Sequence, residues 1–330
     1  MKSRGSRLLT FTGAIAAGAA TMAYTAYQND IKTARRRVET DMRLIDGTDG
    51  PIEFAESGDG PAVLLVHGAG GGFDQGLDLG RAFLGDGYRV IAPSRFGYLG
   101  TPLPADASPE AQADAHLRLV DALQLDSVPV IGVSAGAPSA MQFCLRHPDR
   151  CSALVLIVPL AYMPQRATTA APSAFFEVVL NAIAASDLLF WAATKAARLT
   201  LLKTILGTPV QDYGRATIDE RGRVDQMLRG ILPISRRVAG IRNDSVVSST
   251  LTRYQLEDIR VPALVISAAD DLYGTCERGR YTAEQIPDSK FLGFSTGGHL
   301  LVGHEAEVRS QITNFLKDCL ETGKRTAMAG

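Results

Sequence analysis

The amino-acid sequence predicts an α/β fold in which a mostly parallel sheet is flanked by helices and interrupted by an inserted segment. Three observations lead to this prediction. Short apolar runs of strand length alternate with helical patterns along the chain. At one junction between a strand and a helix, residues 132–136 read Gly-Val-Ser-Ala-Gly. Residues 160–255, about 95 in number, separate two expected core strands and are too many for a simple connection.

The expected strands are short; the first alternates apolar and polar residues, and the others are mainly apolar. They cover residues 52–56, 62–66, 88–92, 128–133, 153–158, 262–267 and 290–294. The run at 62–66 is apolar throughout, which is typical of a strand buried on both faces of a parallel sheet. Helical patterns lie at 73–84, 109–123, 135–146, 278–286 and 305–320. Ligands of such sheets bind beyond the carboxyl ends of the strands, so the loops after Val66 and Val133 are the expected place for a site.

Length and composition are those of an ordinary globular protein. The 330 residues suffice to bury a core, 46% of them are apolar, and the formal net charge is −1. This balance gives no support to a nucleic-acid partner. The four cysteines show neither CxxC spacing nor clustering with histidine, so we expect no metal site. The sequence leaves open whether any of them form a disulfide.

A basic N-terminus precedes an uncharged run at 8–29. This combination is typical of a membrane anchor or of a signal peptide. We favour the anchor; a signal peptide cleaved near residues 21–23 and an amphipathic helix packed on the domain are the alternatives. The protein is accordingly expected to be membrane-anchored or exported, with a cytoplasmic location as the alternative. Residues 1–39 are expected to stand apart from the fold.

Ser134 lies at the apex of the turn that links an expected strand to an expected helix. The spacing Gly-x-Ser-x-Gly at such a junction is the nucleophile elbow of a class of hydrolases. The turn forces the serine into a strained backbone conformation, and side chains at Gly132 and Gly136 would collide with the adjoining strand and helix. The hydroxyl is thereby presented at a helix N-terminus, where free N–H groups favour developing negative charge.

Four features together make the resemblance to a known family specific. They are His-Gly-Ala-Gly at 67–70, the elbow at 132–136, the strand at 263–266 with acidic residues beyond it, and Gly-Gly-His at 297–299. Over residues 50–160 and 255–320 the chain resembles the α/β-hydrolase superfamily. After the N-terminal anchor or signal segment (1–39), the resemblance implies a core (40–159 and 256–330) and a helical lid (160–255). One departure is Ser-Arg-Phe-Gly-Tyr at 94–98, where many members begin a glycine-rich turn with aspartate.

A serine hydroxyl needs a base within hydrogen-bond reach, and histidine has the suitable pKa. The resemblance places that base at His299, after the last strand; His304 is the alternative. The fold uses the order Ser, acid, His, which points to Asp270 or Asp271. Their side chains diverge in a turn, so only one of them should reach the histidine. The family pattern matches Asp271.

The oxyanion of a tetrahedral intermediate also needs hydrogen-bond donors. The elbow supplies the backbone N–H of Ala135, and the loop after Gly68 is expected to supply a second donor. Ala69 is the favoured residue for that second donor, and Gly70 is the next choice.

The function expected from these residues is hydrolysis of a carboxylic ester with an apolar acyl or alcohol part, through an acyl-enzyme. The lid stretch 174–206 is rich in Ala, Leu and Phe and is expected to line an apolar pocket. No cofactor is implied, the partner is a small-molecule ester, and a membrane contact through residues 8–29 is the additional possibility. Two alternatives stay open: a carbon–carbon bond hydrolase of aromatic ring-cleavage products with the same three residues, and a non-catalytic ligand-binding protein on the same fold.

Overall fold

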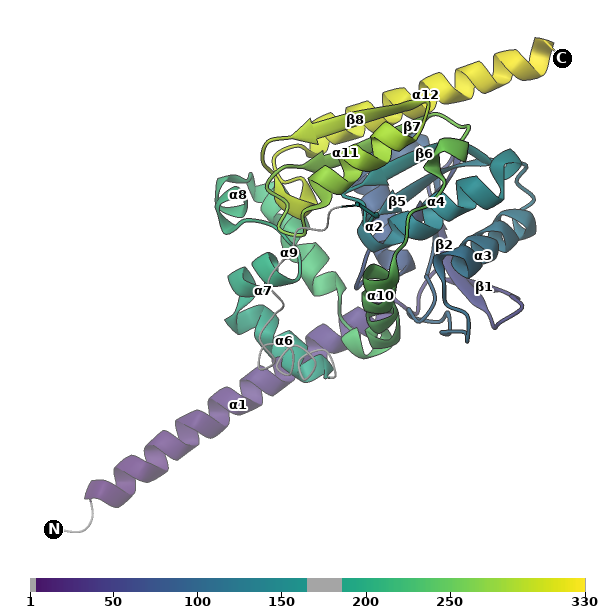
Figure 1. The fold of residues 1–330 in the computed structure, drawn as a ribbon. Helices are drawn as coiled ribbons and strands as arrows, with labels where there is room; N and C mark the ends of the chain where they lie inside the picture. Colours follow the sequence, from purple (N-terminus) through teal and green to yellow (C-terminus); the bar gives the residue numbers. More distant parts are fainter. Residues whose placement is uncertain (1–3, 165–185, 330) are drawn as a thin grey trace.

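The computed structural model describes residues 4–164 and 186–329, which form an eight-stranded sheet covered by helices (Figure 1). The strand order is β1-β2-β4-β3-β5-β6-β7-β8. The strands are β1 (Arg43–Ile45), β2 (Ile52–Ser57), β3 (Ala62–Val66), β4 (Arg89–Pro93), β5 (Val128–Val133), β6 (Cys151–Ile157), β7 (Ala263–Ala268) and β8 (Ser289–Phe294). β2 pairs antiparallel with β1 and β4, whereas all pairs from β4 to β8 are parallel. The mostly parallel sheet predicted from the sequence is thereby confirmed.

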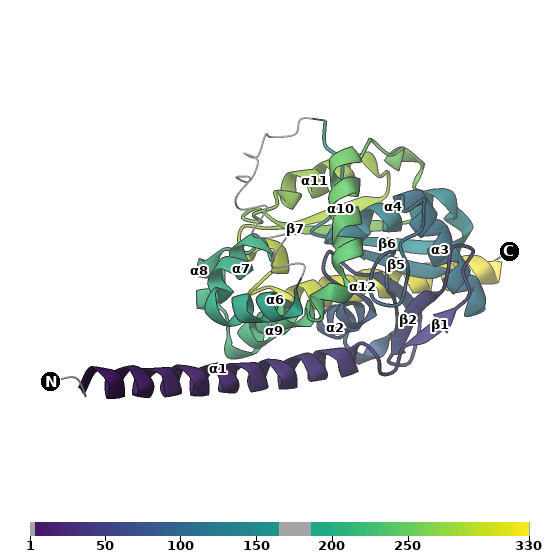
Figure 2. The ribbon, with the colours of Figure 1, turned by 90° about the horizontal axis from the view of Figure 1, so that it is seen from below.

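Helices cover both faces of the sheet, as Figure 2 shows. One face carries α3 (Pro109–Ala122), α4 (Ala137–Arg146) and α11 (Thr275–Gln285), and the other carries α2 (Phe73–Phe83) and α12 (Glu305–Ala329). Successive side chains of a strand point to opposite faces, so Leu64 packs in the first layer and Leu65 in the second. Both are fully buried, which explains why the central strands read as continuous apolar runs.

The short strand β1 was not anticipated from the sequence. It has three residues, and its first two, Arg43 and Leu44, are exposed, so no alternation of apolar and polar residues indicates it. The expected helices agree with the observed ones within a few residues, apart from α12. That helix continues to Ala329, whereas the apolar pattern ends at about Leu320.

The inserted segment between β6 and β7 is helical where the structure describes it. It contains α6 (Asp187–Ala196), α7 (Arg198–Thr204), α8 (Val210–Arg215), α9 (Ile218–Gly230) and α10 (Val238–Thr250). These helices share an apolar cluster that includes Phe190, Leu202 and Leu228. The predicted apolar stretch 174–206 falls within the described residues only from 186 onward.

The N-terminal helix α1 (Arg4–Arg37) projects from the body, but its last turns are part of the fold (Figures 1 and 2). Ile31 and Ala34 are buried in the apolar cluster of the lid helices. Arg37 donates to Asp74 on α2 and to the carbonyl of Leu232. The expectation that residues 1–39 stand apart from the fold is therefore wrong for the last turns of the helix, because their apolar side chains complete the lid.

Residues 8–29, which the sequence analysis interprets as an anchor or signal, lie within α1. In the ranges 4–164 and 186–329, no helix is long and apolar enough to cross a membrane.

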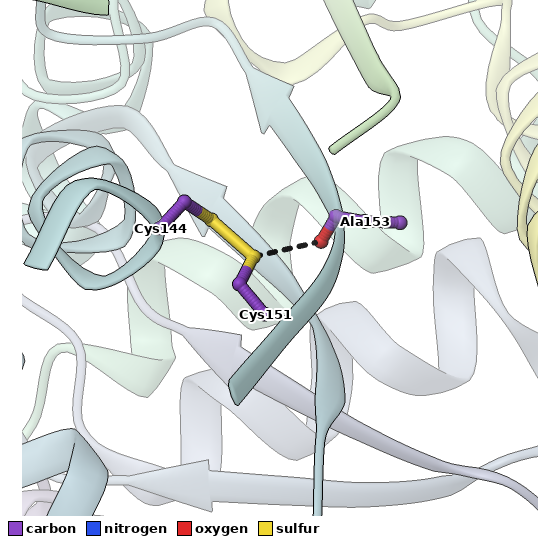
Figure 3. The surroundings of a disulfide bond; sticks show 3 residues. All are labelled: Cys144, Cys151 and Ala153. Atoms are coloured by element: carbon purple, nitrogen blue, oxygen red, sulfur yellow. Dashed lines mark hydrogen bonds between the residues drawn. A yellow bond between two sulfur atoms is a disulfide. The ribbon is translucent and has the colours of Figure 1, made fainter. Parts of the chain in front are cut away.

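A disulfide joins Cys144 at the end of α4 to Cys151 at the start of β6 (Figure 3). Their Cα atoms are 5.3 Å apart because the chain turns back between the helix and the strand within seven residues. Cys276 and Cys319, which also lie in the described ranges, are unpaired. Helix α4 thus follows the Ser134 turn at one end and is cross-linked to the sheet at the other.

Candidate active site

Ser134 lies where β5 ends and the short helix η2 (Ser134–Gly136) begins, directly before α4. Its φ angle is 51°, in the left-handed region that side chains rarely adopt. A Cβ on Gly132 would lie 2.6 Å from the Cβ of Ala140, and a Cβ on Gly136 would lie 2.5 Å from the carbonyl oxygen of Val66. The two glycines are therefore required by crowding against α4 and β3, and together they hold the turn that presents the serine.

Three side chains form a hydrogen-bonded line at the carboxyl edge of the sheet. The Oγ of Ser134 lies 2.9 Å from Nε2 of His299, and Nδ1 of the same ring lies 2.7 Å from Oδ2 of Asp271. The Asp271 side chain is fully buried and that of His299 is 10% exposed. The residues follow the ends of β5, β7 and β8, three parallel strands of one sheet in which β6 lies between β5 and β7. The fold thus brings together side chains that are 165 and 28 residues apart in the sequence.

The carboxylate of Asp271 is held by several donors besides the histidine. Its Oδ1 accepts the backbone N–H of Tyr273 at 2.8 Å, and its Oδ2 accepts the hydroxyl of Thr275. The ring of Tyr273 packs edge-on against His299, with the ring centroids 4.9 Å apart. These contacts fix both the carboxylate and the imidazole that it faces.

The two alternative residues occupy other positions. Asp270 accepts the backbone N–H groups of Gly297 and Gly298 at 3.3 and 2.8 Å, so it holds the loop that leads to His299. The ring of His304 stacks on Phe294 at a centroid distance of 4.1 Å. Neither side chain belongs to the hydrogen-bonded line.

The loop after β3 lies beside the serine, since a Cβ on Gly68 would be 3.2 Å from the Cβ of Ser134. The N–H of Gly70 is taken up by the hydroxyl oxygen of Tyr98 at 3.2 Å. The N–H of Ala69, an exposed residue, has no acceptor within the described chain. Ala135 lies in the first turn of a helix, where N–H groups lack an intrahelical partner. Of the three expected donors, Ala69 and Ala135 thus have N–H groups available for a ligand.

His67 is buried directly behind this loop. Burial, and next the positive charge of Arg95, lower the pKa of His67 well below its ordinary value, so the ring is neutral. Its Nε2 accepts the backbone N–H of Arg95 at 3.0 Å, which leaves the proton on Nδ1. That Nδ1 donates to the carbonyl oxygen of Gly68 at 2.7 Å. His67 therefore supports the backbone of the loop.

Sequence reasoning missed a buried polar group around the same loop. Arg95 forms a bidentate ion pair with Asp244 on α10, and Tyr98 donates its hydroxyl proton to the same carboxylate. Burial and Asp244 raise the pKa of Tyr98 well above its ordinary value, so this hydroxyl remains protonated. Arg95 and Asp244 are 149 residues apart. The departure from the family pattern at residues 94–98 could have drawn attention to Arg95 and Tyr98, but nothing in the sequence identifies their partner in the lid.

The loop between α7 and α8 touches the candidate site directly. The carbonyl oxygen of Gly207 accepts the N–H of Leu272 at 3.0 Å and that of His299 at 3.3 Å. A Cβ on Gly207 would lie 2.7 Å from the ring of Tyr273, so only glycine fits this approach. Another lid residue, Asp212 on α8, faces the carboxylate of Asp270. Burial, and next this second carboxylate, raise the pKa of Asp212.

A separate cleft of about 590 Å³ lies between α2, α9 and α12 and contains none of these residues. Several of its charged side chains pair with one another, as Arg81 does with Asp78 and Arg223 with Glu305. Within the described part of the chain, no three His, Cys, Asp or Glu residues are grouped so that they could hold a metal ion.

Known proteins resemble this chain in sequence and in fold. A family model described as alpha/beta hydrolase fold matches residues 61–305. An uncharacterized hydrolase of Bacillus subtilis is 35% identical over 122 residues, which cover 37% of this chain and 41% of that protein. A 2-hydroxy-6-oxononadienedioate/2-hydroxy-6-oxononatrienedioate hydrolase of Paraburkholderia xenovorans is 27% identical over 285 residues, which cover 83% of this chain and 94% of that protein.

Solved structures show the same fold. An α/β-hydrolase fold protein from Nakamurella multipartita matches with a TM-score of 0.66 at 26% identity, over 83% of this chain and 98% of that one. An esterase from Exiguobacterium antarcticum matches with a TM-score of 0.61 at 21% identity, over 84% and 98% of the two chains, and this likeness concerns the fold alone. With the family model matching more than half of its length, the chain belongs to the α/β-hydrolase fold family.

Proposed function

We propose that the protein is a serine hydrolase that cleaves a carboxylic ester with an apolar acyl or alcohol part. The observation that carries the proposal is the hydrogen-bonded line from Ser134 through His299 to Asp271. A buried carboxylate on one ring nitrogen and a serine hydroxyl on the other are the arrangement in which histidine acts as a general base.

The mechanism follows from these positions. His299 takes the proton of the Ser134 hydroxyl as the oxygen attacks the ester carbonyl, and Asp271 stabilises the imidazolium that forms. The N–H groups of Ala69 and Ala135 bind the oxyanion. The imidazolium then protonates the leaving alcohol, which departs and leaves an acyl group on the serine. Water, activated by the same histidine, attacks the acyl-enzyme and releases the acid.

An uncharged substrate is favoured by the ion pairs of two buried arginines near the loop at residues 67–71. Arg95 is paired with Asp244. Arg237, which donates to the carbonyl of Gly71, is paired with Asp74. Each guanidinium group is thus held by a carboxylate, which Arg237 shares with Arg37, and neither is available to a substrate anion without breaking a buried ion pair.

A carbon–carbon bond hydrolase is the second candidate. It is favoured by relatives at 25–27% identity that are named as hydrolases of 2-hydroxy-6-oxo dienoates or dienedioates. A substrate of this kind carries at least one carboxylate, which an active site must neutralise. The pairing of both arginines described above therefore favours the ester over this alternative.

Replacing Ser134 with Ala tests the proposal. The variant should lose covalent labelling by a fluorophosphonate and should hydrolyse p-nitrophenyl esters several orders of magnitude more slowly. His299→Ala should be about as damaging, while His304→Ala, whose ring packs on Phe294, should keep most of the activity. Ester hydrolysis by Ser134→Ala at a rate near that of the unaltered protein would sink the assignment.

Two further assays separate the alternatives. A wild-type protein that binds ligands but turns over neither esters nor vinylogous diketones is the non-catalytic binding protein. Turnover of a 2-hydroxy-6-oxo dienoate at a kcat/KM that far exceeds the value for activated esters would assign carbon–carbon bond hydrolysis instead.

A further inference from the structure

The residues at 94–98 connect the lid to the oxyanion loop, here defined as residues 67–71. The guanidinium of Arg95 is bound at 2.7 and 2.8 Å by the two carboxylate oxygens of Asp244 on lid helix α10. Its remaining N–H groups point the other way, with Nε donating to the carbonyl oxygen of His67 at 2.9 Å and Nη2 to that of Gly68 at 3.2 Å. One buried side chain thus joins a lid carboxylate to two successive carbonyls of the loop.

Tyr98 makes a second connection between the same partners. Its hydroxyl donates to Asp244 and accepts the N–H of Gly70 at 3.2 Å. Helix α10 lies close enough for this because Gly240 has no side chain: a Cβ there would lie 2.1 Å from the Tyr98 ring. The backbone N–H of Gly240 also donates to the carbonyl oxygen of Gly97 at 2.9 Å. The lid helix is therefore fixed to residues 94–98 by both backbone and side-chain contacts.

The contacts at the carbonyl of Gly68 affect the N–H group that is expected to bind the oxyanion. The carbonyl of Gly68 and the N–H of Ala69 belong to one planar trans peptide, so fixing the oxygen also fixes the direction of the N–H. That oxygen accepts from Nη2 of Arg95, from Nδ1 of His67 and from the N–H of Gly71. Hydrogen bonds accepted at the carbonyl end also polarise the peptide and make its N–H a stronger donor.

We propose that Asp244 is a positioning residue for the oxyanion hole, which acts from the lid through Arg95 and Tyr98 on the Gly68–Ala69 peptide. The inference rests on the proposed function, because it assigns Ala69 as an oxyanion donor. Asp244 orients and neutralises the guanidinium, and the guanidinium aligns the N–H that meets the developing negative charge. The lid is thereby part of the catalytic apparatus as well as a cover.

The test compares Asp244→Asn with wild type on a p-nitrophenyl ester, with active sites counted by fluorophosphonate labelling of Ser134. An oxyanion donor acts mainly in the transition state, so kcat per labelled site should fall about 10- to 100-fold while KM changes by less than about threefold. An alkyl trifluoromethyl ketone, whose adduct with Ser134 carries an oxyanion, should bind more weakly by about the same factor as kcat/KM falls.

Asp187→Asn is the matched control. This aspartate is also buried in the lid, but it binds the N–H and hydroxyl of Ser235 and has no contact with the oxyanion loop. Its loss should lower the melting temperature and leave kcat per labelled site within about twofold of wild type. Should Asp244→Asn fail to fold, Tyr98→Phe removes one hydroxyl from the same group, and a fall of about tenfold in kcat with KM unchanged is expected.

Three results would overturn the proposal. The first is a kcat per labelled site within twofold of wild type in the Asp244 or Tyr98 variant. The second is a fall in the number of labelled sites with no fall in kcat per labelled site. The third is an unchanged affinity for the trifluoromethyl ketone. Failure of the proposed function has a different signature, because wild type itself would then be neither labelled at Ser134 nor active on the ester.

Discussion

Two adjacent aspartates after β7 have separate tasks because their side chains diverge. Asp271 faces the imidazole of His299, with 2.7 Å between Oδ2 and Nδ1, and Asp270 faces the backbone N–H groups of Gly297 and Gly298. One carboxylate holds the ring itself and the other holds the loop that carries the ring. An amide can replace a carboxylate as an acceptor in the second role but cannot stabilise an imidazolium in the first.

We therefore expect Asp271→Asn to lower kcat/KM by about 10⁴-fold, since the amide favours the wrong tautomer of His299. Asp270→Asn should lose no more than about tenfold, because its amide oxygen still accepts from the backbone. Both variants should fold. Measuring kcat/KM of the two variants on one activated ester decides the matter: a larger loss at Asp270 would move the acid to that residue, and small losses at both would place it elsewhere.

The residues of the hydrogen-bonded line could be found from the sequence because each has a local signature. Ser134 lies between two glycines at a strand–helix junction, and His299 follows a glycine pair after the last strand. Asp244 has no such signature: it lies within a helix of the lid, and its partner Arg95 is 149 residues away. Burial of an ion pair is decided by tertiary packing, which single-sequence patterns do not record.

At the scale of elements, the lid is attached to the core on two sides. The loop between α7 and α8 bonds through Gly207 to the loops of Asp271 and His299, and α10 bonds through Asp244 to the oxyanion loop. Most core strands could be predicted because they are apolar and buried on both faces. The lid attachments could not, because their polar contacts join residues that are far apart in the sequence and are decided by tertiary packing.

The attachment near α8 includes an unfavourable pair of carboxylates, Asp212 and Asp270. Burial and the neighbouring carboxylate raise the pKa of Asp212, so the folded state favours its protonated form. The stabilising contribution of this proton is complete below the unfolded pKa of about 3.9 and is lost as the pH rises through the raised folded value. Near neutral pH the two negative charges therefore weaken this contact between lid and core.

Asp212→Asn should remove this pH dependence, because an amide can donate to Asp270 at every pH. The melting temperature of the variant should exceed that of wild type at about pH 8, and the difference should shrink toward about pH 4. Thermal unfolding at a series of pH values measures it. Asp86→Asn, at an exposed position on the core, is the control and should follow the wild-type curve. A parallel shift of the Asp212→Asn curve at all pH values would contradict the explanation.

At the scale of the whole molecule, the candidate active site and the disulfide lie at opposite ends of the strands. Ser134, Asp271 and His299 follow the carboxyl ends of their strands, whereas the disulfide of Cys144 and Cys151 lies at the amino end of β6 (Figure 3). The sequence could not predict that pair, because its proximity depends on the tight return of the chain from α4 into β6.

The N-terminal helix α1 contacts both the lid and the core, so only its first part can be deleted without loss of stability. Arg37 donates to Asp74 on core helix α2 and to the carbonyl of Leu232 in the lid, while Asp30 accepts from the indole of Trp191 at 2.8 Å. The exposed part of the helix, residues 18–26, has no buried side chain. The last turns of α1 are therefore structural, whatever residues 8–29 do.

Deleting residues 1–26 should leave the melting temperature and ester hydrolysis close to those of the full chain. Deleting residues 1–39 removes the buried side chains of Ile31 and Val38, which contribute on the order of 3–5 kcal/mol together with the lost polar contacts. A loss of this size should lower the melting temperature by roughly 10 °C. Thermal unfolding and active-site labelling of the two truncated proteins measure the difference. Equal melting temperatures would show that the last turns of α1 contribute nothing to the lid, and a large loss in the shorter deletion would place a structural role in residues 1–26.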